Sequence, residues 1–330
     1  MAPAATRMTI SMTLPQAERP AKLSLARFLD RMVEAARQAA VPSSLWLAGI
    51  IYQGFSLGWT FGITIALPML EEAMPDGSPF SKLELWGRTV SFTPLIRTDS
   101  IMDLRGGGWI ALLLIPIFFR LVSGLAMIAP ASRWETARGT GRAPSLRQAW
   151  RGGSGFARSA CGLWIQIVLM MFAAALLFIG PTRLLFDYLK LDGNGAPAVL
   201  ATGVCIALVI FYGFVLTVLF QIALHSLVQN RRGVGSALLH AWRIAKNDPM
   251  ATVRATMVDA FLFAGVAVGL GLYLFLLGLV APIIPPPVRG LLILPAILVE
   301  AWTGCARCYY WARSYEALGG LSTRENAPGE

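Results

Sequence analysis

The chain has 330 residues, of which 56% are hydrophobic and only 14% are charged. Soluble domains carry about a quarter charged residues, so this composition excludes an ordinary soluble protein. The net charge of +10 would also suit nucleic-acid binding. The basic residues lie in alternate connections between long apolar blocks, however, which favours the positive-inside pattern of membrane proteins.

Residues 1–22 contain proline, threonine and charged residues without an apolar core, which predicts a disordered arm and no cleavable signal. From Leu23 to Arg37 the apolar residues follow the helical period, with charged residues off that face. This pattern predicts an amphipathic helix ahead of the first apolar block. We expect residues 23–318 to form one membrane domain and residues 319–330 to form a polar tail.

Six apolar blocks are long enough to cross a bilayer as helices. The predicted spans cover about residues 45–70, 109–128, 161–179, 199–224, 257–283 and 291–310. Connections 131–159 and 227–254 hold six and five basic residues against one acidic residue each, while connection 71–107 holds four basic and six acidic residues. The positive-inside rule therefore predicts a multi-pass protein with both termini in the cytoplasm.

A short basic stretch occurs twice, as SLRQAWR at 145–151 and ALLHAWR at 237–243. A weaker third copy without tryptophan lies near the N-terminus. Each copy precedes an apolar block, as expected of a helix that lies at a membrane surface. We expect these helices to face anionic lipid headgroups through Arg147, Trp150, Arg151, Trp242, Arg243 and Lys246. The predicted fold is therefore all-α: three transmembrane hairpins, each preceded by an amphipathic surface helix.

The layout and the segment Ala237–Lys246 (ALLHAWRIAK) resemble poorly characterised bacterial six-span membrane proteins, including the membrane domain found beside some glycerophosphodiester phosphodiesterases. The segment Cys305–Leu318 (CARCYYWARSYEAL) is similar to the way in which such proteins finish. The resemblance implies a place in the bacterial inner membrane. The first copy of the repeat departs from the pattern, because three glycines follow Arg151. No soluble phosphodiesterase domain is present, so the resemblance assigns no catalytic residue.

Glycines mark two of the predicted spans. Gly54, Gly58 and Gly62 follow one another at four-residue spacing in the first span, and Gly265 and Gly269 do so in the fifth. Such strips let another helix approach closely, so we expect them to serve helix packing. A substrate groove is the alternative for the first strip.

Charged residues inside spans are costly, and they mark either packing contacts or functional sites. Arg120 and Glu300 lie near the middle of the second and sixth spans, at similar depth from the outer boundary. We therefore predict that they pair and that these two spans are neighbours. Asp259 is close to a cytoplasmic boundary, where we expect water to solvate it. The pair has two interpretations, a structural ion pair or a substrate or proton site.

Catalytic signatures are missing from the sequence, which lacks a glycine-rich phosphate loop, an H-E-x-x-H motif and a G-x-S-x-G motif. His225 and His240 have no ligand partner at useful spacing. Cys305 and Cys308 form a C-x-x-C toward a helix C-terminus, where packing of small side chains is favoured over metal or redox chemistry.

We therefore expect no cofactor, no metal and no enzymatic activity. The sequence favours a membrane scaffold, assembly or lipid-associated factor that contacts anionic lipids, with another membrane protein or a second copy as a further partner. A small-solute or lipid transporter or channel that uses Arg120 and Glu300 is the alternative. An intramembrane enzyme ranks third, since no nucleophile and base pair is visible.

Overall fold

The computed structural model describes residues 24–40, 43–54, 108–130, 144–189, 196–280 and 285–321. All regular structure within these ranges is helical, as predicted. The elements in chain order are α1 (Leu25–Ala39), α2 (Trp46–Gly54), α7 (Gly108–Ile128), α9 (Leu146–Gly152), the 3-10 turn η3 (Gly153–Gly155), α10 (Ala157–Leu189), α11 (Ala196–Gln229), α12 (Val234–Asn247), α13 (Pro249–Val280) and α14 (Pro286–Ala317).

The membrane character of the chain is carried by its long apolar helices. Within the described ranges, three stretches are long and apolar enough to cross a bilayer, at Ala157–Phe178, Phe211–Gln229 and Pro249–Tyr273. A shorter apolar stretch covers Leu114–Ile128. These stretches indicate a membrane protein. Most of the first predicted span, 45–70, lies outside the described residues, as do Gly58 and Gly62.

The helix ends follow local capping chemistry. The Ser24 side chain accepts a hydrogen bond from the Arg27 amide at the start of α1, and Ser145 and Gln148 form a reciprocal capping box at α9. Pro286 opens α14, so the triple proline begins the helix rather than forming only a turn. Proline suits this position because its missing N–H would have no partner in the first turn.

The long helices exceed the predicted spans. Helices α10, α11, α13 and α14 have 33, 34, 32 and 32 residues. At 1.5 Å per residue each is about 48–51 Å long, whereas the hydrocarbon core of a bilayer is about 30 Å thick. Each helix therefore has room for a membrane segment and a further segment of several turns.

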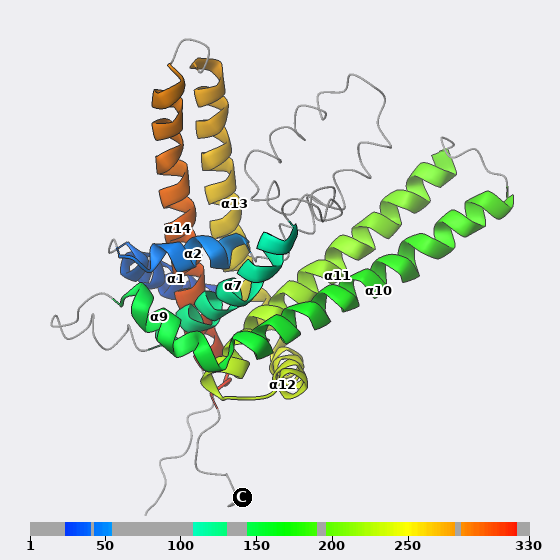
Figure 1. Ribbon diagram of the computed structural model, residues 1–330. Coiled ribbons are helices and arrows are strands. Elements are labelled where there is room, and N and C mark those ends of the chain that lie inside the picture. Colours follow the sequence, from blue (N-terminus) through cyan, green and yellow to red (C-terminus); the bar gives the residue numbers. More distant parts are fainter. Residues whose placement is uncertain are drawn as a thin grey trace, which may run out of the picture.

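The two segments differ in burial. In Figure 1, α10 runs beside α11 and α13 beside α14, and the two pairs diverge from a common lower part where α1 and α2 lie across α14. In this lower part every residue of α11 from Val218 to Val228 and of α14 from Thr303 to Tyr315 is buried. Large apolar side chains in the upper part are exposed, among them Leu200 and Leu291.

Glycines let two pairs of helices cross at very short range in the lower part. A Cβ added at Gly304 of α14 would lie 1.8 Å from the Gly49 carbonyl oxygen of α2. A Cβ at Gly153 would lie 1.8 Å from the Arg120 carbonyl oxygen, and one at Gly124 of α7 would lie 1.8 Å from the Ala149 carbonyl oxygen. Only glycine fits these positions, because any side chain would overlap the backbone of the neighbouring helix.

Candidate functional site

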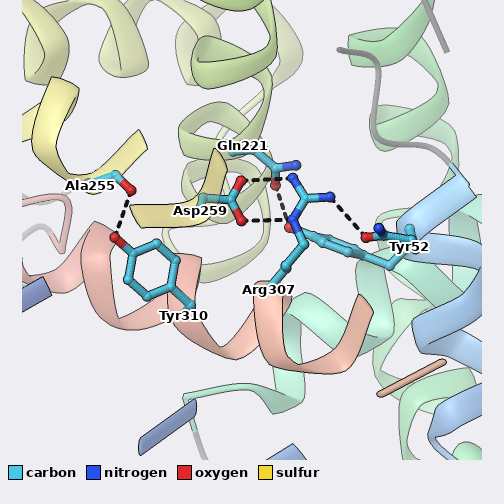
Figure 2. A network of polar contacts seen from close by, with 7 residues as sticks. Tyr52, Gln221, Ala255, Asp259, Arg307 and Tyr310 are labelled. Atoms are coloured by element: carbon cyan, nitrogen blue, oxygen red, sulfur yellow. Dashed lines mark hydrogen bonds and ion pairs between the residues drawn. The ribbon is translucent and has the colours of Figure 1, made fainter. Parts of the chain in front are cut away.

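Arg307 and Asp259 form an ion pair in which both charged side chains are buried. Arg307 of α14 donates through Nε and one terminal nitrogen to the two carboxylate oxygens of Asp259 on α13, at 2.7 Å each. The two side chains are only 4% and 8% exposed. Figure 2 shows the guanidinium and the carboxylate facing each other in the fork geometry that makes such pairs strong.

Further polar groups complete the surroundings of the guanidinium. The other terminal nitrogen of Arg307 donates to Oε1 of Gln53 on α2, at 2.9 Å. Tyr52, the neighbour of Gln53, donates its hydroxyl proton to the side-chain oxygen of Gln221 on α11. The Phe263 ring lies 5.2 Å from the guanidinium carbon, at cation–π distance. Two neighbouring hydrogen-bonded groups thus link α2 to α11 and α2 to α13 and α14. We call them together the Arg307 cluster: Tyr52, Gln53, Gln221, Asp259 and Arg307.

One turn along α14, Tyr310 makes a second polar contact between α13 and α14. Its hydroxyl donates to the carbonyl oxygen of Ala255 at 2.7 Å, one turn before Asp259 on α13 (Figure 2). Both Tyr310 and Ala255 are buried. The contact between α13 and α14 in the lower part is therefore polar and specific. In the upper part, the Tyr273 hydroxyl of α13 also donates to the Leu292 carbonyl oxygen of α14.

Glu300 lies at the edge of the Arg307 cluster. It is half-buried on α14, two turns before Arg307, and its carboxylate is hydrogen-bonded to the Gln53 side chain. Gln53 accepts from Arg307 through its oxygen, so the amide lies between the cation and the second carboxylate. The buried arginine near Glu300 is therefore Arg307 and not the predicted Arg120.

Arg120 contacts Trp150 instead of Glu300, the partner predicted from their similar depth. Its Nε donates to the carbonyl oxygen of Trp150 at 2.8 Å, and its guanidinium lies 4.0 Å from the centroid of the Trp150 ring. The predicted contact between Arg120 and Glu300 is not made. The reason is that α7 packs on α9 and η3 beside Arg120, whereas Glu300 lies in the cluster built on α2 and α14.

The residues predicted to face lipid headgroups differ in their exposure. Arg147, Arg151, Arg243 and Lys246 are exposed, and Trp242 is 52% exposed. Trp150 is half-buried and stacked against Arg120, so its indole is engaged within the protein.

The predicted glycine strip of α13 has no close neighbour among the described residues. A Cβ at Gly265 or Gly269 would meet nothing within 4 Å. Cys305 takes part in the crossing of α2 and α14 instead: its thiol lies 3.5 Å from the Leu45 carbonyl oxygen, and a Cβ at Gly49 would approach its sulfur to 2.6 Å. Both Cys305 and Cys308 are buried and unbridged, in agreement with packing of small side chains.

The two histidines of the chain both lie beside Tyr315, at the C-terminal end of α14. The rings of His225 and His240 lie 6.2 and 6.3 Å from the Tyr315 ring. Asn230 donates to the Tyr315 hydroxyl and to the Gly320 carbonyl oxygen, at 2.7 Å each, and His240 Nε2 lies 3.1 Å from that carbonyl oxygen.

The surroundings of this aromatic group shift the pKa values of His240 and Tyr315. Burial lowers the pKa of His240, and the charges of Arg232 and Arg243 lower it further against the opposing effect of the Gly320 hydrogen bond. Burial raises the pKa of Tyr315 to about 12, so its hydroxyl stays protonated. The group therefore fastens the end of α14 to α11 and α12 in the neutral forms of its side chains.

The sequence did carry a signal for the Asp259–Arg307 pair. Asp259 lies two residues after the start of the predicted span 257–283, and Arg307 lies three residues before the end of the predicted span 291–310. In two antiparallel neighbours these positions have nearly the same depth, about 3–5 Å from the shared cytoplasmic end. Arg307 also lies between the two cysteines of the C-x-x-C. Tyr52 and Gln53 gave no such signal.

Comparisons with family models, curated proteins and solved structures find no match to this chain. Within the described residues, no group of three or more His, Cys, Asp or Glu side chains could hold a metal ion.

Proposed function

We propose that the chain is a non-enzymatic integral membrane protein that acts as a membrane scaffold, assembly or lipid-associated factor in the bacterial inner membrane. The observation that carries this proposal is that Arg307 is bound by other side chains of the protein. The Arg307 fork takes both oxygens of Asp259, and its remaining terminal nitrogen is bound to Gln53. Such a cluster fixes how four helices pack.

Charge placement supports a lipid partner. A catalytic or transport site needs polar groups that face a substrate or a water-filled path. The exposed basic residues of α9 and α12 suit anionic headgroups, as each such residue near a membrane surface contributes about 1 kcal/mol. These residues are Arg147, Arg151, Arg243 and Lys246.

The proposed topology has six spans with both termini in the cytoplasm. It rests on the loop charges and on the length of the described helices. Single cysteines at Ser78 and Gly193 should react with an impermeant thiol reagent added outside whole cells, whereas cysteines at Thr140 and Gly233 should not. Labelling of Thr140→Cys from outside would refute the six-span arrangement.

Transport through Arg120 and Glu300 is the weaker candidate. A path through both charges would need them side by side or along one cavity. The engagement of Arg120 with Trp150, and of Glu300 with Gln53, counts against it.

The lipid association can be tested with the full-length protein. Purification in mild detergent, followed by mass spectrometry of bound phospholipids and proteins, should recover anionic phospholipid with the wild-type chain. Replacing Arg147, Arg151, Arg243 and Lys246 with glutamine should reduce that amount several-fold, and raised salt should mimic the replacement.

The matched control keeps the charge by replacing the three arginines with lysine and leaving Lys246 in place. It should retain the lipid. Equal phospholipid in the glutamine variant and the control, with no dependence on salt, would contradict the lipid-associated role.

A further inference from the structure

Helix α1 has three faces rather than two. Phe28, Met32, Ala35 and Ala39 are buried and form its contact with the lower part of the protein. Trp302 of α14 donates its indole N–H to the Ala36 carbonyl oxygen at 3.1 Å. Buried Arg313 pairs with Glu34. These contacts fix which sides of α1 can reach the surroundings.

The second face is apolar and uncovered. Leu25, Leu29 and Val33 lie one helical turn apart in a single row, and they are 42%, 47% and 49% exposed. On a helical wheel this row adjoins the buried face. The third face carries the exposed charges Arg27, Asp30, Glu34 and Arg37 and lies opposite. Three large aliphatic side chains in one exposed row are unfavourable in water.

The depth of α1 matches the inner edge of the bilayer core. Helix α1 is bonded to Trp302 and Arg313, which lie 16 and 27 residues beyond Pro286. These positions are about 24 and 40 Å along α14, and they bracket the thickness of about 30 Å of the hydrocarbon core. With the start of α14 at the outer boundary, as the proposed topology requires, α1 lies where acyl chains meet headgroups.

The exposed apolar surface of α14 continues to this point. Its large exposed side chains run from Val288 to Val299, and Trp302, less than one turn further, makes the contact with α1. The row on α1 thus extends an apolar surface that already faces lipid in the proposed topology. Figure 1 shows α1 lying across α14, which is the orientation of an interfacial helix beside a span.

We propose that Leu25, Leu29 and Val33 of α1 form a membrane-contact face that enters the boundary between headgroups and acyl chains of the cytoplasmic leaflet. The inference rests on the membrane placement in the proposed function and adds an apolar contact on a helix that carries no tryptophan. Trp150 of α9 is occupied by Arg120. The neighbouring charged face of α1 stays in water, as in amphipathic helices that lie in the interface plane.

A spin label reports the surroundings of each face in the full-length protein reconstituted into phosphatidylethanolamine–phosphatidylglycerol vesicles. Cys161 and Cys205 are replaced by serine, and the buried Cys305 and Cys308 are kept. A nitroxide is attached at L29C, with D30C on the charged face as the matched control. V268C, on the exposed upper part of α13, reports the membrane itself.

The label at Leu29 should collide mainly with oxygen, which concentrates in lipid. The label at Asp30 should collide mainly with a water-soluble nickel chelate. If the Leu29 label behaves like the Asp30 label while the Val268 label reports lipid, the membrane-contact face is refuted and the membrane placement stands. Dipolar broadening between Leu29 labels on two copies would also refute it, because a second copy would then cover the row. If the Val268 label also reports water, the placement in the proposed function fails as well.

Discussion

Replacing Asp259 with leucine should destabilise the protein severely, because it leaves Arg307 charged and without its carboxylate. Arg307 is 4% exposed on its side chain, and two of its hydrogen bonds go to Asp259. Removing one partner of a buried pair costs about 3–5 kcal/mol, because the remaining charge loses its compensation without regaining water. The bond to Gln53 and the Phe263 ring soften this loss without replacing a full negative charge.

The double variant Asp259→Leu/Arg307→Met should be more stable than either single variant, since no uncompensated charge remains. The free energy of unfolding is measured in mixed micelles by titration with sodium dodecyl sulfate, for the wild type, both single variants and the double variant. Asp30→Leu, on the exposed face of α1, is the control and should change the free energy by no more than about 0.5 kcal/mol. Single losses that simply add in the double variant would show that the two charges do not interact, and the reasoning would fail.

Two further predictions concern packing and pH. Gly304→Ala should destabilise the protein by about 1–3 kcal/mol in the same titration, because the new Cβ would overlap the Gly49 carbonyl oxygen at 1.8 Å. Gly265→Ala, where nothing lies within 4 Å, should be neutral or stabilise the helix by up to about 1 kcal/mol; equal losses would contradict the crossing geometry. Since the pKa of His240 is lowered in the folded protein, stability should fall as the pH drops below about 6.5, where the unfolded chain takes up a proton that folded His240 resists. A His240→Gln variant whose melting temperature keeps the full wild-type dependence on pH would exclude this residue as a cause.

The helical class of the chain was predictable because it follows from local rules. Apolar blocks of bilayer length have to be helical, since a helix satisfies its own backbone hydrogen bonds in lipid. Serine caps and prolines then mark the starts of α1, α9 and α14. The predicted spans nevertheless fell inside longer helices, because hydropathy detects the apolar part of a helix and misses its polar extension.

The candidate site was predictable only in part. Asp259 and Glu300 stood out as charged residues in apolar stretches, but their partners did not. Depth alone gave Arg120 and Glu300 as a pair, and the structure instead brings Arg120 to Trp150 and Arg307 to Asp259. Depth is one coordinate, and a contact also requires that two helices be neighbours and that the side chains face each other.

The sequence by itself therefore determined the membrane class, the helices and the basic surface stretches, because these depend on composition and on neighbours a few residues apart. The tertiary structure alone decided which charges pair, which glycines serve crossings and which face of α1 stays uncovered. Gly49 and Gly304 meet across 255 residues of chain, whereas Gly265 and Gly269 have no neighbour within 4 Å in the part of the chain that the structure describes. Close approach depends on how two whole helices are placed, and no local pattern encodes that placement.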